Sequence, residues 1–209
     1  HDKFKTLIHF SSSEVYGSAQ KTPMDESHPL NPLSTYAVSK LSAERLCYTF
    51  SHEHDFPVII QRQFNVFGPR ETHPYIIPEL ISQLSKTSKL KLGNISSSRD
   101  FTFVEDAVQA SISLMKEEKS TGQVFNCATG KDYTIKEIAQ AIGTLLGKND
   151  ISISTENTRL RPLDVQKLVG DSSKIKKLTG WQPKVSFKEG LQKTIDWFAE
   201  NNSSWPYKK

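Results

Sequence analysis

Segments typical of β-strands and of α-helices alternate along this sequence. Residues 56–68 (FPVIIQRQFNVFG) leave no room for polar alternation until their end, which indicates a strand buried on both faces. Together with the flanking helical segments, such a strand predicts an α/β fold with a buried parallel sheet. The expected strands cover residues 5–11, 56–68, 89–94, 122–129 and 151–155, and the expected helices cover 34–54, 73–86, 101–118, 134–148, 171–180 and 186–201.

The expected architecture is a partial doubly wound, Rossmann-like parallel sheet with a smaller C-terminal substrate-binding lobe. At least three parallel strands should include residues 7–11, 58–65 and 123–127. Asp171 and Ser186 are the expected N-caps of the last two helices. The sheet domain is assigned to residues 1–70 and 99–128, and the lobe to residues 71–98 and 129–209.

Charge and cysteine usage narrow the class of protein. The net charge is only +4, from 27 basic and 23 acidic residues, which suits a phosphorylated small ligand better than a nucleic acid. No apolar run approaches the roughly 20 residues of a membrane span, and the first ten residues read as the lead-in to a core strand rather than a signal peptide. Cys47 and Cys127 lie in apolar surroundings without metal-ligand spacing, which favours reduced thiols, no metal site and a cytoplasmic location.

A cluster of polar side chains follows the first expected strand. The segment SSSEVYG, residues 11–17, stands at the carboxyl end of that strand, where ligands bind in open α/β sheets. In an extended backbone Ser12 and Glu14 point the same way, so a hydroxyl and a carboxylate could face one substrate. A solvated Ser/Glu-rich turn is the alternative interpretation of the same residues.

Tyr36 and Lys40 stand four residues apart in the expected helix 34–54, so they share one helix face. An ammonium group nearby favours the phenolate and is expected to lower the pKa of Tyr36, which would make it a usable acid and base. The spacing is common in helices. Its combination with a hydroxyl-bearing strand end is much more specific.

The segments SSSEVYG, DESHPLNPLSTYAVSK and QRQFNVFGPRE together resemble the extended short-chain dehydrogenase/reductase family, and within it the NAD-dependent nucleotide-sugar epimerases and dehydratases. The likeness runs from residue 7 to about residue 199. It implies that Ser12, Tyr36 and Lys40 form a catalytic set around the nicotinamide of NAD or NADP. It further implies that Lys40 holds the nicotinamide ribose, that Phe64 joins the cofactor site and that Asn65 contacts a nucleotide-diphosphate sugar.

Glu14 is informative within this family. A carboxylate there can remove the C5 proton once C4 is a ketone, so that water leaves from C6, as a 4,6-dehydratase requires. Ser13, assigned to the substrate site, resembles the GDP-mannose 4,6-dehydratase branch and differs from the Asp of the dTDP-glucose branch. Some epimerases also carry the Glu, and residues 25–46 read more like epimerases and 4-keto-6-deoxy-hexose reductases, so those activities stay open.

Two further segments, residues 92–108 and 161–183, resemble the GDP-sugar branch. The resemblance implies that Arg99 and Arg161 bind the ribose and diphosphate of the nucleotide, for which a planar and permanently charged guanidinium is suited. Surface arginines in salt bridges are the alternative.

The sequence departs from the family in one major respect, since the Gly-rich turn that takes the cofactor's adenosine and diphosphate is not present. About 100 residues, or three strand-helix units, would be needed to supply it. We expect either a fragment of a longer enzyme or a cofactor-binding half on another chain. A non-catalytic nucleotide-sugar-binding remnant is the competing hypothesis.

The complete protein is expected to be a homodimer. Related proteins commonly dimerise through the helix that bears the Tyr and Lys. The opposite face of residues 36–53 carries more apolar side chains than a solvated helix needs, namely Leu41, Leu46, Cys47 and Phe50.

Overall fold

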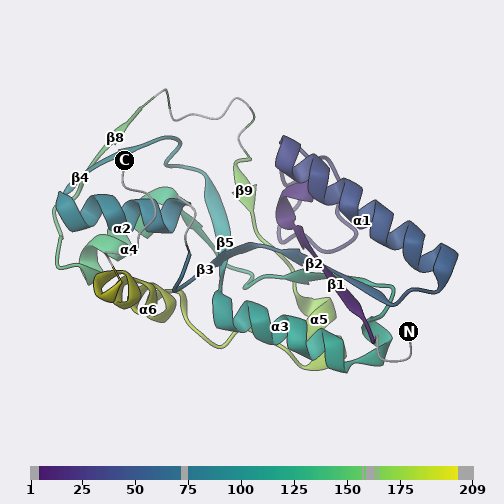
Figure 1. Ribbon diagram of the computed structural model, residues 1–209. Helices are drawn as coiled ribbons and strands as arrows, with labels where there is room; N and C mark the ends of the chain where they lie inside the picture. Colours follow the sequence, from purple (N-terminus) through teal and green to yellow (C-terminus); the bar gives the residue numbers. More distant parts are fainter. Residues whose placement is uncertain (1–4, 72–74, 157, 159–162, 164, 202–209) are drawn as a thin grey trace.

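The computed structural model describes residues 5–71, 75–156, 158, 163 and 165–201 (Figure 1). Three parallel strands form one sheet in the order β1-β2-β6, with β1 at Leu7–Ser12, β2 at Val58–Gln63 and β6 at Val124–Cys127. This confirms the α/β class and the three expected parallel strands. Among the described strands β1 pairs with β2 alone, and Phe10 on this edge strand is 51% exposed.

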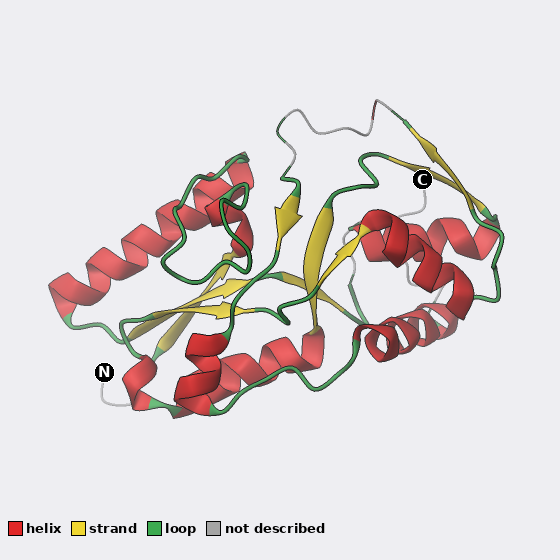
Figure 2. Cartoon of the chain, turned by 180° about the vertical axis from the view of Figure 1, so that it is seen from behind, coloured by secondary structure: helices red, strands yellow, loops and turns green. Residues whose placement is uncertain are grey.

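Helices cover both faces of this sheet, as a doubly wound fold requires. The long helix α1 (Thr35–His54) contacts β1 and β2 on one face, and α3 (Val104–Lys116) and α5 (Ser173–Thr179) lie on the other (Figures 1 and 2). Two short 3-10 helices complete this part, η1 (Ser13–Tyr16) directly after β1 and η2 (Glu118–Ser120) before β6.

The two faces of the sheet differ in chemistry. Ser11, Arg62 and Asn126 are register partners across β1, β2 and β6, and all three are buried. The α3 and α5 side is packed with apolar residues instead, including Ile59, Ala107, Ala110, Leu114, Phe125, Ile175 and Trp181. A buried polar row therefore crosses the sheet on its α1 side, whereas on the α3 side the buried Gln61 accepts a hydrogen bond from the Ser111 hydroxyl at 2.8 Å among mainly apolar neighbours.

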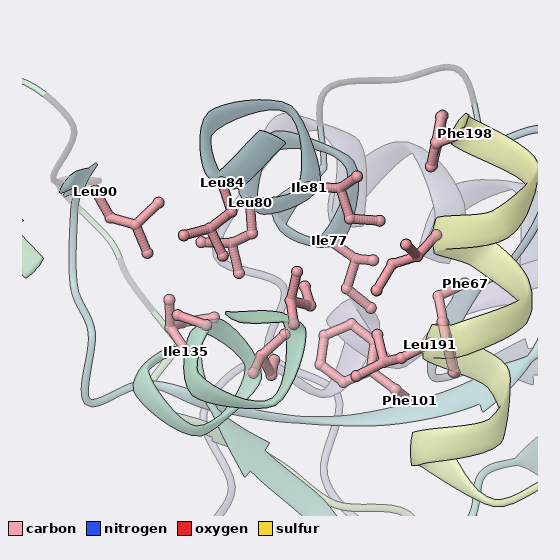
Figure 3. Close-up of a cluster of buried hydrophobic side chains, with 14 of the residues drawn as sticks. Phe67, Ile77, Leu80, Ile81, Leu84, Leu90, Phe101, Ile135, Leu191 and Phe198 are labelled. Atoms are coloured by element: carbon pink, nitrogen blue, oxygen red, sulfur yellow. The ribbon is translucent and has the colours of Figure 1, made fainter. Parts of the chain in front are cut away.

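A second group of elements surrounds the largest hydrophobic cluster. The strands are β3 (Asn65–Phe67), β5 (Ser98–Phe103), β7 (Asp132–Thr134) and β9 (Lys167–Leu168) in one sheet, with β4 (Lys89–Leu92) and β8 (Ser152–Thr155) in another. Helices α2 (Ile76–Lys86), α4 (Ile135–Leu145) and α6 (Phe187–Glu200) complete it. Figure 3 shows side chains from α2, α4 and α6 gathered between these helices, together with Phe67 and Phe101 of the strands.

Three expectations need correction. The expected strand 56–68 is two strands, because Phe64 donates its backbone N–H to the Cys127 carbonyl (3.0 Å) and the chain then leaves the first sheet to pair with β5. The expected helix 101–118 begins only at Val104, since residues 98–103 form β5. Ser172, not Asp171, occupies the N-cap position of α5, although the Asp171 carboxylate accepts a hydrogen bond from Ser173 N at 2.7 Å. The Ser186 cap of α6 is confirmed.

The division into a sheet domain and a lobe stays a prediction. One observation bears on it, because residues 173–181 were predicted to belong to the lobe. Helix α5 and Trp181 pack against α3 and β6, and the Trp181 indole donates to the Asp106 carbonyl at 3.0 Å. This part of residues 129–209 therefore returns to the parallel sheet.

Candidate active site

A cavity of about 540 Å³ lies at the carboxyl ends of β1 and β2. Its walls come from η1, the start of α1, the β2–β3 junction, α2 with the residues just before it, and the β4–β5 connection. It lies where the topology of an open α/β sheet favours ligand binding. Seven of the residues singled out in the sequence line it: Ser12, Ser13, Glu14, Tyr36, Phe64, Asn65 and Arg99.

Hydrogen bonds connect the end of β1 with the start of α1. The Ser12 hydroxyl accepts from Glu14 N at 3.2 Å and caps η1. Ser34 donates to the Glu14 carboxylate at 3.1 Å while its hydroxyl accepts from Ala37 N at 3.0 Å, which caps α1. One residue thus fixes both the carboxylate and the first turn of the helix that carries Tyr36.

Ser12 and Glu14 both line the cavity, but the backbone conformation predicted to bring them together is wrong. An extended backbone was expected there, but residues 13–16 form η1. Gly17 ends this turn at φ 67°, and a Cβ atom there would lie 2.0 Å from the Asn31 carbonyl oxygen. Only glycine fits this approach, which holds η1 against the chain leading into α1.

Tyr36 is 49% exposed at the cavity. Burial raises the pKa of its phenol, the Tyr75 and Glu14 side chains raise it further, and a hydrogen bond with Ser12 opposes them. The expectation that Lys40 lowers this pKa is therefore wrong in this structure. The Lys40 ammonium donates to the Phe10 carbonyl at 2.9 Å and lies 5.8 Å from the centre of the Tyr36 ring.

The other predicted site residues differ in placement. Phe64 is 1% exposed and packs with Tyr16 and Met24, so most of its ring is covered by protein. Arg99 lines the cavity, and its guanidinium donates to the Ser98 carbonyl at 2.9 Å. Arg161 lies outside the described residues.

Asp100 holds the strand end next to Arg99. Its buried carboxylate accepts hydrogen bonds from Thr129 N (2.9 Å), the Thr129 hydroxyl (2.6 Å), Gly130 N (2.8 Å) and Gly170 N (3.3 Å). Burial raises the pKa of this carboxyl, and the hydrogen bonds oppose that shift. The result is a fixed junction between β5, the end of β6 and the chain after β9.

Beneath α1 lies a buried polar network that sequence reasoning missed. The Arg62 guanidinium donates to both oxygens of Glu44, at 2.9 and 2.7 Å, and to the Tyr16 hydroxyl at 3.0 Å. The Tyr16 hydroxyl donates to Asn126 Oδ1 at 2.7 Å, and the Ser11 hydroxyl donates to Glu44. Two features of the sequence could have revealed the Arg62–Glu44 ion pair. Arg62 is a charged residue inside an apolar strand, and Glu44 is an acidic residue one helical turn beyond Lys40.

Other cavity residues were also missed, among them Gln63, Glu71, Tyr75, Glu79 and Asn94. Within the described part of the chain, the acidic, His and Cys side chains form no cluster of three that could hold a metal ion. Nor does any helix among those residues combine the length and apolarity needed to cross a membrane.

Proteins of known name match this chain over nearly its whole length. Residues 1–194 match the family model described as GDP-mannose 4,6 dehydratase. The dTDP-D-glucose 4,6-dehydratase of Homo sapiens is 33% identical over 208 residues, which cover 97% of this chain and 59% of that protein. The GDP-6-deoxy-D-mannose reductase of Pseudomonas aeruginosa is 29% identical, over 92% of this chain and 66% of that protein.

A solved structure shows the same fold. The dTDP-glucose 4,6-dehydratase of Bacillus anthracis, in complex with NAD, superposes with a TM-score of 0.86 at 30% identity, over 96% of this chain and 63% of that chain. The chain thus spans about 59% of the length of the human relative. Family model, relatives and fold agree, and the chain belongs to the GDP-mannose 4,6 dehydratase family of extended short-chain dehydrogenase/reductase proteins.

Proposed function

We propose that the whole protein is an NAD(P)-dependent nucleotide-sugar 4,6-dehydratase, for which this chain supplies the substrate cavity and the catalytic side chains. One observation carries the proposal. The Glu14 carboxylate and the Tyr36 phenol line a single cavity, and Ser34 links the carboxylate to the helix that bears the phenol. A dehydratase needs both groups, because two different protons must be removed from one sugar.

The donor set at the end of β1 fits the nicotinamide end of the cofactor. A hydroxyl, a phenol and an ammonium, from Ser12, Tyr36 and Lys40, are gathered there, and such groups suit a ribose diol. When bound, NAD(P)+ accepts a hydride from C4 and later returns it to C6. The 209 residues contain no G-x-x-G-x-x-G turn, so we propose that the adenosine and diphosphate are bound by other residues of the whole protein.

The side chains of this chain handle the protons. Tyr36 takes the proton from the C4 hydroxyl as that carbon is oxidised to a ketone. Glu14 then removes the proton from C5, which the ketone has acidified, and the C6 hydroxyl leaves as water. Of the two protons taken up by Tyr36 and Glu14, one leaves with the C6 hydroxyl as water and one is supplied to C5 when C6 is reduced, so the net change is the loss of one water molecule.

The rest of the cavity fits a nucleotide-diphosphate sugar. Arg99 offers a permanent positive charge for the diphosphate, and Arg161 is proposed for the same role from its sequence. Ser13 and Asn65 add neutral hydrogen-bonding groups to the cavity that Glu14 lines. The match to the family model described as GDP-mannose 4,6 dehydratase supports a nucleotide-diphosphate sugar as the ligand.

The test is exchange of the C5 hydrogen with solvent. The full-length product of the gene is incubated in deuterated water with NAD(P)+ and, separately, GDP-mannose, dTDP-glucose and UDP-glucose. We expect a 4-keto-6-deoxy sugar with deuterium at C5. Turnover of any of these sugars without deuterium at C5 would exclude the dehydratase.

A reductase is the second candidate, favoured by the likeness to the Pseudomonas GDP-6-deoxy-D-mannose reductase. It would use Ser12, Tyr36 and Lys40 to reduce a 4-keto-6-deoxy sugar and would leave the C5 hydrogen in place. A 4-epimerase would also leave it in place. A non-catalytic remnant would bind nucleotide sugars without any turnover.

We also propose that the whole protein is a homodimer through the outer face of α1. Leu46 is 72% exposed, Phe50 is 49% exposed and Cys47 is partly exposed on this helix. Leu41, which was expected on the same face, packs inward against the cluster that holds Tyr16 and Phe64. A helix with this much exposed apolar surface is better suited to a protein–protein interface than to contact with water. Replacing Leu46 by Glu is expected to shift the full-length protein from dimer to monomer in light scattering.

Met115→Glu is the matched control for the dimer. Met115 is an equally apolar, 51% exposed residue, but it belongs to α3, on the opposite face of the sheet from α1 (Figure 1). A dimer that persists in Leu46→Glu, or one that is lost equally in Met115→Glu, would place the interface elsewhere.

A further inference from the structure

Glu71 is held in the cavity wall by a tight turn. It follows β3, and its N–H donates to the Gly68 carbonyl at 3.4 Å, which closes residues 68–71 into a turn. Gly68 has φ 154°, and a Cβ atom there would lie 2.5 Å from the Val104 side chain. Because packing against α3 fixes this turn, the position of Glu71 in the cavity wall is set by the fold.

One oxygen of the Glu71 carboxyl group lacks the hydrogen-bond partner that a buried acid normally has. Its Oε2 atom is buried and has no hydrogen-bond partner. The other acids of the cavity differ, since Glu14 accepts from Ser34 and Glu79 accepts from the Gln83 amide at 2.8 Å. A buried polar atom without a partner is costly, so such a group in a cavity wall is a natural contact for a ligand.

The protonation state of Glu71 decides which ligand group fits it. Burial raises the pKa of this carboxyl to about 8, which favours its neutral form at pH 7. A neutral carboxyl has one O–H donor and one carbonyl acceptor, whereas a carboxylate only accepts. Among the residues that the structure describes, the other titratable or charged groups of the cavity wall are Glu14 of η1, Tyr36 of α1, Tyr75 and Glu79 at the start of α2, and Arg99 of β5.

We propose that Glu71 is a substrate-contact residue that donates a hydrogen bond from its neutral carboxyl group to a sugar hydroxyl of the bound nucleotide sugar. A hydroxyl also donates and accepts, so the two groups can pair in both directions. The diphosphate is the poorer partner, because Glu71 offers it no positive charge and Arg99 does. This inference rests on the proposed function only in taking a nucleotide sugar as the ligand.

The experiment separates the sugar from the nucleotide. Calorimetric titration of the full-length protein at pH 7 compares the tightest binder among GDP-mannose, dTDP-glucose and UDP-glucose with its nucleoside diphosphate alone. Glu71→Ala is expected to weaken binding of the nucleotide sugar by about 5- to 10-fold, the usual worth of one hydrogen bond, and to change binding of the diphosphate less than about twofold. Glu71→Gln keeps a donor and is expected to bind both ligands nearly as the wild type does.

Raising the pH gives a second readout. Wild-type affinity for the nucleotide sugar should fall from pH 7 to pH 9 as Glu71 loses its proton, while the amide of Glu71→Gln should hold its affinity. Glu105→Gln, at an exposed position of α3, is the control and should follow the wild type.

Each outcome bears on the inference. Equal losses for both ligands in Glu71→Ala, or the same pH profile in wild type and Glu71→Gln, would overturn it. Binding with these differences but without C5 exchange would support Glu71 and reject the dehydratase. Failure of all three sugars to bind the wild type would overturn both.

Discussion

Replacing Arg62 by Met is expected to lower the free energy of unfolding by about 3–5 kcal/mol, the usual cost of leaving one member of a buried ion pair without its partner. Arg62 and Glu44 have side chains that are 5% and 3% exposed, and three hydrogen-bond donors of the guanidinium are used within the network. Without Arg62 the carboxylate would keep only the Ser11 hydroxyl among these partners. Urea denaturation followed by circular dichroism measures the change.

Two further variants test the cause of this loss. Glu44→Leu combined with Arg62→Met removes both charges, so the double variant should be more stable than Arg62→Met alone. Lys193→Met breaks an exposed pair with Glu189, whose side chains are 43% and 52% exposed, and should cost only about 0.2–1 kcal/mol. Similar losses in Arg62→Met and Lys193→Met would show that burial of the pair contributes nothing.

The network also bears on the position of the catalytic groups. Glu44 is one helical turn beyond Lys40 on α1, and Ser11 immediately precedes Ser12 on β1. The ion pair therefore anchors the helix of Tyr36 and Lys40 to the strand that ends at the cavity. Arg62 itself does not line the cavity, so its role is to position other residues.

The parallel sheet could be predicted because its signal is local. A run such as residues 58–60 is apolar at every position, and only burial on both faces satisfies it. The break at Phe64 could not be predicted in the same way. It depends on a hydrogen bond to Cys127 and on pairing with β5, both distant in sequence. Likewise, residues 101–103 were predicted to begin a helix, but they belong to a strand whose Phe101 and Phe103 pack in the largest hydrophobic cluster.

The candidate site shows the same limit. Glu14 and Tyr36 stood out because they belong to recognisable segments, and the structure brings both to one cavity. Glu71 ends another of these segments, but its place in the cavity wall could not be predicted, because it depends on the turn at Gly68 and on the close approach of Gly68 to Val104. The pKa of Tyr36 was misjudged for a related reason. Helical spacing places Lys40 near the ring, but only the fold shows that its ammonium donates to the Phe10 carbonyl.

Replacing Glu14 by Gln is expected to lower the rate of sugar dehydration by about 10² to 10⁴, the usual contribution of a general base. Gln has the same shape and can still accept a hydrogen bond from Ser34, so the first turn of α1 should keep its cap. Oxidation at C4, which relies on Tyr36, should survive, and loss of water should stall.

Rapid mixing of the full-length protein with NAD(P)+ and the nucleotide sugar separates these two steps. In Glu14→Gln we expect absorbance of the reduced nicotinamide to rise and persist, with little deuterium entering C5, whereas Tyr36→Phe should abolish the rise itself. Ser34→Ala is the matched control, because it removes the hydrogen bond to Glu14 and the helix cap but leaves the carboxylate in place. If Glu14→Gln exchanges C5 hydrogen at the wild-type rate, another group must remove that proton, and Glu14 would be left with a role in holding Ser34 and the start of α1.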